Sequence, residues 1–521
     1  MKVSEILIQE LIKSRIKTSA DLAFFKRKAS KKYKILCPSN IELLKAYHKL
    51  VKNKSIRKSL KVQGLLKTRP VRSLSGIVNI SVLTKSYPCP GKCLYCPTEK
   101  GIPKSYVSGE PAVERAKKLN YDPYLQVKKR IEMLEAEGHP TDKIELRIVG
   151  GTWSYYLKNY QNWFVKKCFN ASNKKISKNL KEAQKLNERV KHRIVGLSIE
   201  TRPDFINEKE IKKLRELGVT MVELGVQSIY DDVLKLNLRG HKVKETISAT
   251  KLLKNAGFKV LYQMMPNLPG SNLKQDEKMF EELFQNPDFQ PDLLKIYPCA
   301  LLKESPLYQW WLKGKYKPYS EKTLINLVKK IKKKIPYYVR IQRIARDVPS
   351  QKIIAGAKIS NLRQIIQQDR KREGWKCKCI RCREVKENYN PKEKVYLYRE
   401  DYNASEGREI FLSFENKKRT KFFSLLRLRL TQAGSASVFP ILRGAAIIRE
   451  IKTFGELVPI GIKKIAPQHK GLGKKLIKEA EKITKREFGL NKIAVISGIG
   501  TREYFRKLGY NLRDSYMMRK I

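Results

Sequence analysis

Across residues 76–345, short β-branched segments alternate with charged stretches of helical character, and this alternation constrains the fold most strongly. Strands that are each followed by a helix are typical of a parallel sheet, which we expect to close fully or partly into a (βα) barrel. The predicted strands are 76–83, 144–149, 194–199, 221–225, 260–264 and 293–296, and clear helical stretches are 124–137, 208–217 and 243–256.

The rest of the chain divides into three further regions. Residues 1–75 are a basic segment, residues 346–395 are a short, charged, cysteine-rich linker, and residues 396–521 have a second α/β pattern. In that last region we expect several strands, then a helix at 471–488 and a strand at 493–497. The predicted fold class is therefore α/β, with a partial parallel barrel, a smaller C-terminal α/β domain and a helical N-terminal module.

Cys89, Cys93 and Cys96 lie in a loop directly after the first predicted strand, with the spacing C-x3-C-x2-C. Three thiolates can hold three irons of a 4Fe-4S cluster and leave the fourth iron open. S-adenosylmethionine (SAM) chemistry requires such an open iron, and the aromatic Tyr95 also fits the radical SAM signature. A zinc knuckle or a group of buried cysteines is the alternative, which is disfavoured because structural zinc usually takes four protein ligands.

Small and polar residues follow the later strands of the predicted barrel. Because ligand-binding groups in α/β barrels gather at the carboxyl ends of the strands, we expect these residues to form a SAM pocket. Each alone has an ordinary interpretation, a glycine turn or a surface ion pair, so the prediction depends on their appearance after successive strands. They are Gly150, Gly151 and Thr152, then Glu200 and Arg202, then Glu223 and Gln227.

A second cysteine cluster, formed by Cys377, Cys379 and Cys382, lies in the linker. A tetrahedral zinc site needs a fourth ligand, and no histidine lies nearby in the sequence. Cys299, at the end of a predicted strand, is our candidate for that ligand. A second iron-sulfur cluster is the main alternative, followed by a redox-active or structural thiol group.

The charge balance points to a polyanionic partner. The chain has 111 Lys and Arg residues against 50 acidic residues, a formal net charge of +61. Residues 1–72 contribute 20 of these basic residues and only four acidic ones, with apolar residues spaced as on amphipathic helices. Phosphate neutralisation adds affinity through counterion release, so we predict a folded RNA-binding module. A lysine-rich proteome is the alternative cause of the total, although it does not explain the clustering.

No apolar run reaches the roughly 18 residues of a membrane span, and the N-terminus lacks a signal-peptide core. We therefore expect a cytoplasmic protein without a membrane partner. Nine cysteines in that compartment indicate metals or catalysis rather than disulfides. The oligomeric state stays open, with a homodimer among the alternatives.

The C-terminal region contains the pattern Q-x-x-G-x-G, in which Gln468, Gly471 and Gly473 are followed by Lys474. We expect a strand at 456–462 before it and a helix that begins within it. Backbone N–H groups at such a helix N-terminus can hold a pyrophosphate. The pattern resembles the coenzyme A signature of GNAT acetyltransferases, and a glycine-rich loop without a ligand is the alternative.

Over nearly its full length the sequence resembles the catalytic subunit of Elongator, a radical SAM and GNAT enzyme family. The cysteine spacing is that of archaeal and bacterial members. The resemblance implies an enzyme that makes 5-carboxymethyluridine at the tRNA wobble position, with the anticodon region as its RNA partner. The stretches that carry the resemblance are 88–97, 103–106, 199–204, 264–271 and 494–502.

The family's chemistry implies that a SAM-derived 5′-deoxyadenosyl radical abstracts hydrogen from the acetyl-CoA methyl group. The carbon radical would add to C5 of uridine, and thioester hydrolysis would leave the carboxymethyl group. Lys143 would connect coenzyme A to the radical domain, and Tyr504 and Phe505 occupy the place of two family tyrosines. The remaining implied acetyl-CoA contacts are Glu450, Ile451, Lys452, Thr453, Leu472, Gly473 and Lys474.

Several residues depart from the family pattern. Phe505 lacks the hydroxyl that an ordinary acetyl-transfer mechanism would use, while Gln263 and Asn267 replace the usual His and Gly. Two rival functions remain, a protein lysine acetyltransferase with a structural radical domain and a non-catalytic tRNA-binding scaffold. The basic N-terminal module, the complete cysteine motif and Phe505 argue against the first, and the cysteines argue against the second.

Overall fold

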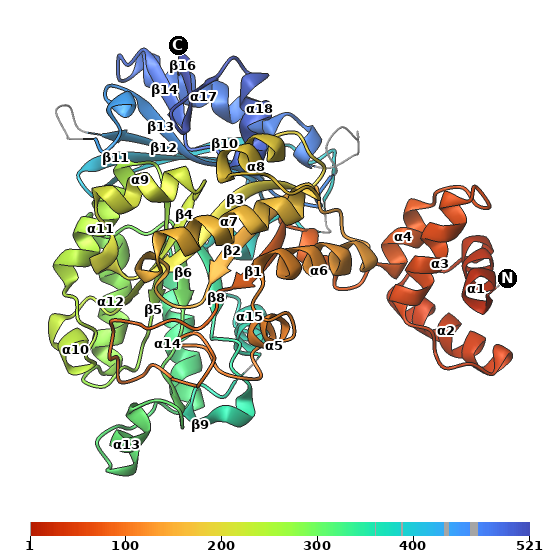
Figure 1. Cartoon of the computed structure of the whole chain (residues 1–521), viewed down its shortest axis with the longest axis horizontal. Coiled ribbons are helices and arrows are strands. Elements are labelled where there is room, and N and C mark those ends of the chain that lie inside the picture. The colour runs from red at the N-terminus through yellow and green to blue at the C-terminus, as the bar shows by residue number, and fades with distance from the viewer. Residues whose placement is uncertain (1, 360, 387–388, 432–436, 459–466) are drawn as a thin grey trace.

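The computed structural model describes residues 2–359, 361–386, 389–431, 437–458 and 467–521. A parallel sheet with the order β1-β2-β3-β4-β5-β6-β8 forms the centre of the larger domain (Figure 1). The order begins at β1 and ends at β8, so the barrel is partial, as predicted. The strands are β1 (Val78–Leu83), β2 (Lys143–Val149), β3 (Arg193–Thr201), β4 (Met221–Gln227), β5 (Lys259–Met264), β6 (Leu293–Ile296) and β8 (Arg340–Ile344).

Helices cover the outer face of this sheet and bury its apolar side chains. On β2, for example, Ile144, Leu146 and Ile148 belong to the main core, and the residues between them face the lumen of the barrel. This alternation follows from the two-residue repeat of a strand. The helices of this domain, of which α13 projects away from the sheet (Figure 1), are α5 (Pro111–Lys117), α6 (Pro123–Ala136), α7 (Lys158–Asn173), α8 (Leu180–Asn187), α9 (Glu208–Glu216), α10 (Asp231–Leu236), α11 (Val243–Asn255), α12 (Leu273–Gln285), α13 (Leu307–Leu312) and α14 (Glu321–Lys334).

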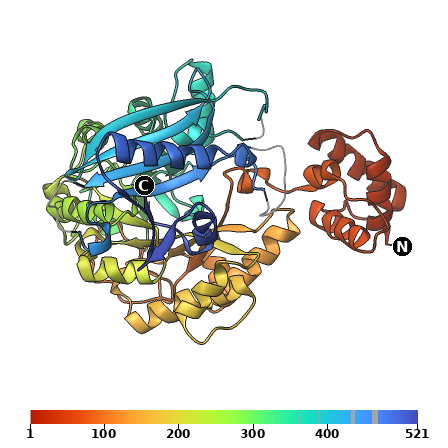
Figure 2. The ribbon, with the colours of Figure 1, turned by 90° about the horizontal axis from the view of Figure 1, so that it is seen from above.

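The C-terminal domain contains a mixed sheet with the order β10-β11-β12-β13-β14-β16-β15, in which β13 and β14 are parallel. The apolar face of α17 packs on this sheet, because Leu476, Ala480 and Ile483 share a core with the strands. The domain lies over one end of the barrel (Figures 1 and 2). Its elements are β10 (Tyr396–Ala404), β11 (Gly407–Glu415), β12 (Phe422–Thr431), β13 (Ala446–Thr453), α17 (Leu472–Arg486), β14 (Lys492–Val495), α18 (Arg502–Arg506), β15 (Asn511–Arg513) and β16 (Tyr516–Lys520).

A buried ion network joins this domain to the barrel. Arg449 of β13 donates to Asp292 Oδ1 at 3.0 Å and to Glu409 Oε2 at 2.8 Å. Arg429 donates to Glu409 Oε1 at 2.9 Å. Lys254 Nζ lies 3.9 Å from Asp292 and 3.7 Å from Glu409, and it has no hydrogen-bond partner in the described part of the chain. The two domains therefore share charged groups that water cannot reach.

The N-terminal helices form a small core of their own beside the main body (Figure 1). Thr18 and Ser39 each cap a helix through a capping box, which fixes where those helices begin. The following linker docks on the end of α6, where the Thr68 N–H donates to the Glu137 carbonyl at 3.1 Å. The helices are α1 (Val3–Lys13), α2 (Ser19–Tyr33), α3 (Asn40–Lys52) and α4 (Leu60–Leu66).

The structure differs from the predicted elements in three places. Strand β8 was not predicted, and the linker contains the helices α15 (Leu362–Arg372) and α16 (Ile380–Arg383) and the strand β9 (Ile353–Gly356), which pairs with β7 (Ala300–Leu302). The predicted strand at 456–462 is not formed at 456–458, and its remainder lies outside the described residues. No described helix is long and apolar enough to cross a membrane.

Candidate functional site

The loop after β1 places Cys89, Cys93 and Cys96 at the carboxyl edge of the parallel sheet. Backbone hydrogen bonds tie this loop to its surroundings, since the Leu94 N–H donates to the Asn237 carbonyl at 3.1 Å. The three sulfur atoms do not all lie within 4.8 Å of one another. A single zinc ion with bonds of about 2.3 Å would draw them closer, so this spread suits a multi-iron cluster better.

Gly91 keeps space open between two of these sulfurs. A Cβ there would lie 3.4 Å from Cys93 Sγ, 3.7 Å from Cys89 Sγ and 2.5 Å from Arg202 Nη1. Arg239 donates to Cys93 Sγ at 3.6 Å, which stabilises a thiolate. The cradle and its guanidinium groups fit an anionic iron-sulfur cluster held by the loop.

A buried group of polar side chains occupies the lumen. Lys295 Nζ lies 3.2 Å from Glu200 and forms a shorter ion pair with Glu223. Gln263 Nε2 donates to both carboxylates, and the Tyr106 hydroxyl donates to Glu200 at 2.9 Å. Burial acts against the charged amine, but Glu223 and its neighbours raise the pKa of Lys295, which therefore stays protonated. The sequence analysis missed Lys295, although a lysine inside an otherwise apolar strand was the available signal.

The predicted SAM-pocket residues divide between this lumen and the cysteine loop. Glu200 and Gln227 line a cavity of about 460 Å³ together with Cys96. Thr152 Oγ1 lies 3.8 Å from Cys89 Sγ, next to the cysteine loop. Glu223 does not line the cavity itself, but it contacts two residues that do, Lys295 and Gln263. Gly150 and Gly151 follow β2 with φ values of 135° and 101°, and Arg202 beside the loop is bound to Asp204 at 2.9 and 2.7 Å.

A second cavity, of about 650 Å³, lies between the amino ends of the barrel strands and the C-terminal domain. It brings together almost all of the residues predicted to contact acetyl-CoA. Leu472 is the exception, because its side chain is buried in the main core. The predicted residues that line the cavity are Lys143, Glu450, Ile451, Lys452, Thr453, Gln468, Gly471, Gly473, Lys474, Tyr504 and Phe505.

Gln468 connects the two domains at this cavity. Its Oε1 accepts a hydrogen bond from Lys143 Nζ at 2.9 Å. Its Nε2 donates to the carbonyl groups of Gly76 at 3.0 Å and Thr453 at 3.3 Å. Because the side-chain amide is already used in this way, Gln468 positions the loop, while burial lowers the pKa of Lys143.

The N-terminus of α17 faces the same cavity. Gly471 is the N-cap residue with φ 68°, and, as a glycine, it has no side chain that could cap the helix. A Cβ at Gly473 would lie 3.2 Å from the Tyr504 hydroxyl, so the glycine leaves room for that hydroxyl at the cavity. Burial raises the pKa of Tyr504 to about 12. Backbone N–H groups at a helix N-terminus, here beside Lys474, are suited to a pyrophosphate.

Strand β2 connects the two cavities. Lys143 and Glu145 line the second cavity, whereas Arg147 and Val149 line the first. Arg147 Nε donates to Glu145 at 3.0 Å, and Lys452 Nζ lies 3.9 Å from Glu145 on its other side. Burial opposes ionisation of Glu145, but Arg147 and Lys452 hold its pKa well below the usual range. Burial also lowers the pKa of Lys452 to about 8.

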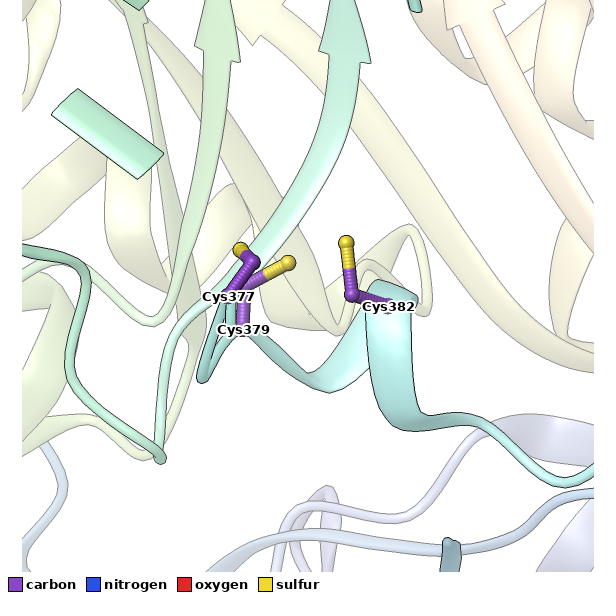
Figure 3. Close-up of side chains that lie close together, drawn as sticks. All are labelled: Cys377, Cys379 and Cys382. Atoms are coloured by element: carbon purple, nitrogen blue, oxygen red, sulfur yellow. The ribbon is translucent and has the colours of Figure 1, made fainter. Parts of the chain in front are cut away.

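The second cysteine cluster is compact. The sulfur atoms of Cys377, Cys379 and Cys382 all lie within 4.8 Å of one another and face a common space (Figure 3). Lys332 Nζ lies 3.5 Å from Cys377 Sγ and 3.3 Å from Cys382 Sγ. Hydrogen bonds from the other two thiols, together with Lys332, lower the pKa of Cys382.

The structure does not bring Cys299 to this cluster, which corrects our prediction of the fourth ligand. Cys299 follows the carboxyl end of β6 and packs with Leu301 and Tyr316 in another core. The cluster lies at the amino end of the parallel neighbour β8, where the Ile380 N–H donates to the Val339 carbonyl at 3.0 Å. The two positions are therefore at opposite edges of one sheet.

Comparison with known proteins agrees with this fold and site. The Radical SAM superfamily model matches residues 84–283, and the Radical_SAM C-terminal domain model matches residues 291–372. These matches include the cysteine loop and strands of the barrel, so the fold and site define a radical SAM enzyme. Radical SAM enzymes use a 4Fe-4S cluster and SAM, and the cysteine loop fits the cluster.

Relatives cover nearly the whole chain. The tRNA uridine(34) acetyltransferase of Methanocaldococcus infernus is 46% identical over 93% of this chain and 92% of its own length. Elongator complex protein 3 of Homo sapiens is 38% identical over 88% of this chain and 86% of its own. The solved structure of archaeal M. infernus Elp3 with residues 1–46 deleted is 44% identical, with a TM-score of 0.75, and covers 86% of this chain and 100% of that one. The chain belongs to this family of tRNA uridine(34) acetyltransferases and Elongator complex protein 3.

Proposed function

We propose that this protein modifies uridine 34 of tRNA, and that it makes 5-carboxymethyluridine with acetyl-CoA as the carbon source. The observation that carries the proposal is the placement of two cavities along one strand. The cavity beside Cys96 and the cavity beside the α17 loop are both lined by β2. The printed names of the relatives favour tRNA uridine 34 as the substrate.

The cysteine loop would hold the cluster through Cys89, Cys93 and Cys96, with Arg239 beside Cys93. When bound, the cluster and SAM supply a 5′-deoxyadenosyl radical that can take hydrogen from an acetyl methyl group. Lys295 would hold the Glu200 carboxylate in place, so that its oxygens can accept hydrogen bonds from hydroxyl groups of a ligand in the lumen.

The C-terminal domain would bind acetyl-CoA in the cavity of about 650 Å³. Gly471, Gly473 and Lys474 would hold the pyrophosphate at the start of α17, and the edge of β13 at 450–453 would offer backbone groups to the pantetheine arm. Lys143, fixed by Gln468, would face the thioester side of the cavity. Tyr504 borders the same space, and the neighbouring Phe505 has no hydroxyl for proton transfer.

The N-terminal helices would bind the tRNA outside the anticodon loop, because they combine a folded core with a strong excess of positive charge. We also propose that Cys377, Cys379 and Cys382 hold one zinc ion, since their compact spacing suits a single metal. Metal analysis checks the zinc: Cys379→Ser should lose zinc and keep iron, whereas the exposed Cys37→Ser should keep both.

The function is tested on anaerobically reconstituted enzyme with SAM, a reductant and tRNA. Acetyl-CoA labelled with ¹³C at the methyl carbon should yield labelled 5-carboxymethyluridine in nucleoside mass spectrometry. Cys93→Ala should abolish the product but leave tRNA binding intact, and Cys37→Ala is the matched control. A fully loaded enzyme that binds tRNA yet forms no labelled nucleoside would overturn the proposal, and acetylated lysine in a protein acceptor would favour the rival acetyltransferase.

A further inference from the structure

The cavity of about 460 Å³ carries an excess of positive charge that the radical chemistry does not explain. Six basic and three acidic side chains line it. Most of the basic groups have a carboxylate partner close by. The partnered groups are Arg147 with Glu145, Arg343 with Asp347, Arg346 with Glu110, and Lys295 with Glu200 and Glu223.

Arg115 and Arg130 are different. Neither forms an ion pair with any residue in the described ranges. Within those ranges, Arg130 donates a weak hydrogen bond to the sulfur of Met133 at 3.3 Å, and Arg115 forms no side-chain hydrogen bond. Arg115 projects from α5 and Arg130 from α6, and both side chains are half-buried at the cavity. Half-buried guanidinium groups without a carboxylate partner destabilise the folded state through desolvation, unless a bound anion pairs with them.

Further arginines surround this pair. Burial lowers the pKa of Arg130 to about 10, and the positive charges of Arg115, Arg72 and Arg69 act in the same direction. Arg72 lies in the linker that leads to the N-terminal helices, and it is paired with Glu137. Arg69 and Arg72 of the linker therefore lie close enough to Arg130 for their charges to act on it.

We propose that Arg115 and Arg130 together bind a backbone phosphate of the RNA strand next to the nucleotide that enters the cavity. This inference rests on the proposed function for its choice of RNA. A phosphate can accept hydrogen bonds from both planar guanidinium groups, and it supplies the negative charge that the pair lacks. Such a contact fixes the register of the strand without reading its sequence.

Other anions fit the pair less well. A coenzyme A pyrophosphate has its own helix N-terminus at the opposite end of β2. An RNA strand running from the cavity to the linker would meet Arg115, Arg130 and then the N-terminal helices.

The test uses the full-length protein with its cluster and an RNA hairpin that carries the anticodon loop. Binding is measured against salt concentration for the wild type, Arg115→Gln, Arg130→Gln and the exposed control Lys485→Gln on α17. Each cavity variant should weaken binding by about tenfold. The salt slope should fall by about 0.7 for a single-stranded contact that is lost, whereas the control should change little. Iron content and SAM binding report whether each variant is folded.

A second measurement does not depend on the folding of a variant. Hairpins with one neutral methylphosphonate, placed in turn at each loop phosphate, are bound to the wild type and to the double variant Arg115→Gln/Arg130→Gln. Neutralising one phosphate beside the target uridine should lower the binding affinity of the wild type about tenfold, and that of the double variant less than about twofold.

The outcomes separate the site from the reaction. Equal losses in the wild type and the double variant at every phosphate would overturn the phosphate site, even if labelled 5-carboxymethyluridine forms. Conversely, a methylphosphonate effect confined to the wild type would support the site even if no product appears, in which case the proposed function fails alone. Unchanged affinity and salt slope in both single variants would also overturn the site.

Discussion

Replacing Lys254 by methionine should stabilise the protein at neutral pH. The amine is buried between the two domains, and no described atom accepts a hydrogen bond from it. Burial lowers its pKa from 10.5 to about 8, against the attraction of Asp292 and Glu409. That difference corresponds to about 3.4 kcal/mol against the charged amine. Methionine has a similar length and no charge, while Arg429, Arg449 and also Arg427, which lies 3.6 Å from Asp292, remain in the network.

The sign of the pH dependence follows from the same values. Between about pH 8 and pH 10.5 the unfolded chain holds the Lys254 proton and the folded chain has released it, so stability rises with pH. The free energy of unfolding of Lys254→Met should therefore exceed that of the wild type by about 3 kcal/mol at pH 7 and by only about 1 kcal/mol at pH 9.5. Urea unfolding at both pH values, followed by tryptophan fluorescence, measures the difference.

Arg449→Met is the contrasting variant in the same network. It leaves Asp292 and Glu409 without their closest hydrogen-bond donor, so its free energy of unfolding should be lower than that of the wild type by about 3–5 kcal/mol. If Lys254→Met loses as much as Arg449→Met, or if its effect does not change with pH, then the lysine supports the interface and our account of the network is wrong.

Three further substitutions probe the sites. Gly91→Ala should lower the iron content per chain, because the new Cβ meets two of the cluster sulfurs and a guanidinium. The control Gly64→Ala, whose Cβ would have nothing within 4 Å, should keep its iron. Equal iron content in both variants would contradict our account of the cysteine loop as the cluster site. Gly473→Ala should weaken acetyl-CoA binding in calorimetry, since its Cβ lies 3.2 Å from the Tyr504 hydroxyl, and unchanged affinity would remove the cavity as the binding site. Lys295→Met should destabilise the barrel by about 3–5 kcal/mol in urea unfolding, because it leaves the buried carboxylates of Glu200 and Glu223 without their cation, and a neutral effect would contradict this role of the lysine.

Much of the fold could be predicted from the sequence because its strands are short, apolar and β-branched. Strands β1 to β6 were found in this way, since the local pattern and the burial of these strands agree. Strand β8 was missed because its sequence, Arg-Ile-Gln-Arg-Ile, contains three polar residues and has neither a continuous apolar run nor a regular alternation. Such a strand is fixed by pairing with β6, which is a long-range contact that local patterns do not contain.

The candidate site was predictable where the residues follow each other closely in the chain. The cysteine loop and the α17 loop are local motifs. The first lines the cavity of about 460 Å³ through Cys96, and the second lines the cavity of about 650 Å³ through Gly471 and Gly473. Cys299 failed because linear spacing does not reveal which edge of the sheet a residue occupies. Lys295 and Gln468 were harder still, because their partners Glu200 and Lys143 are far away in the sequence and meet them only in the folded chain.

Strand β2 also limits how this protein can change during evolution. Its residues from Lys143 to Val149 span about 20 Å, with one site at each end of the same face. Either cavity can be altered by substitution without affecting the other. A one-residue insertion, however, would turn Arg147 and Val149 toward the helices and the apolar residues toward the lumen. The strand thus acts as a spacer of fixed length, and we expect relatives to vary in composition along it but not in residue number.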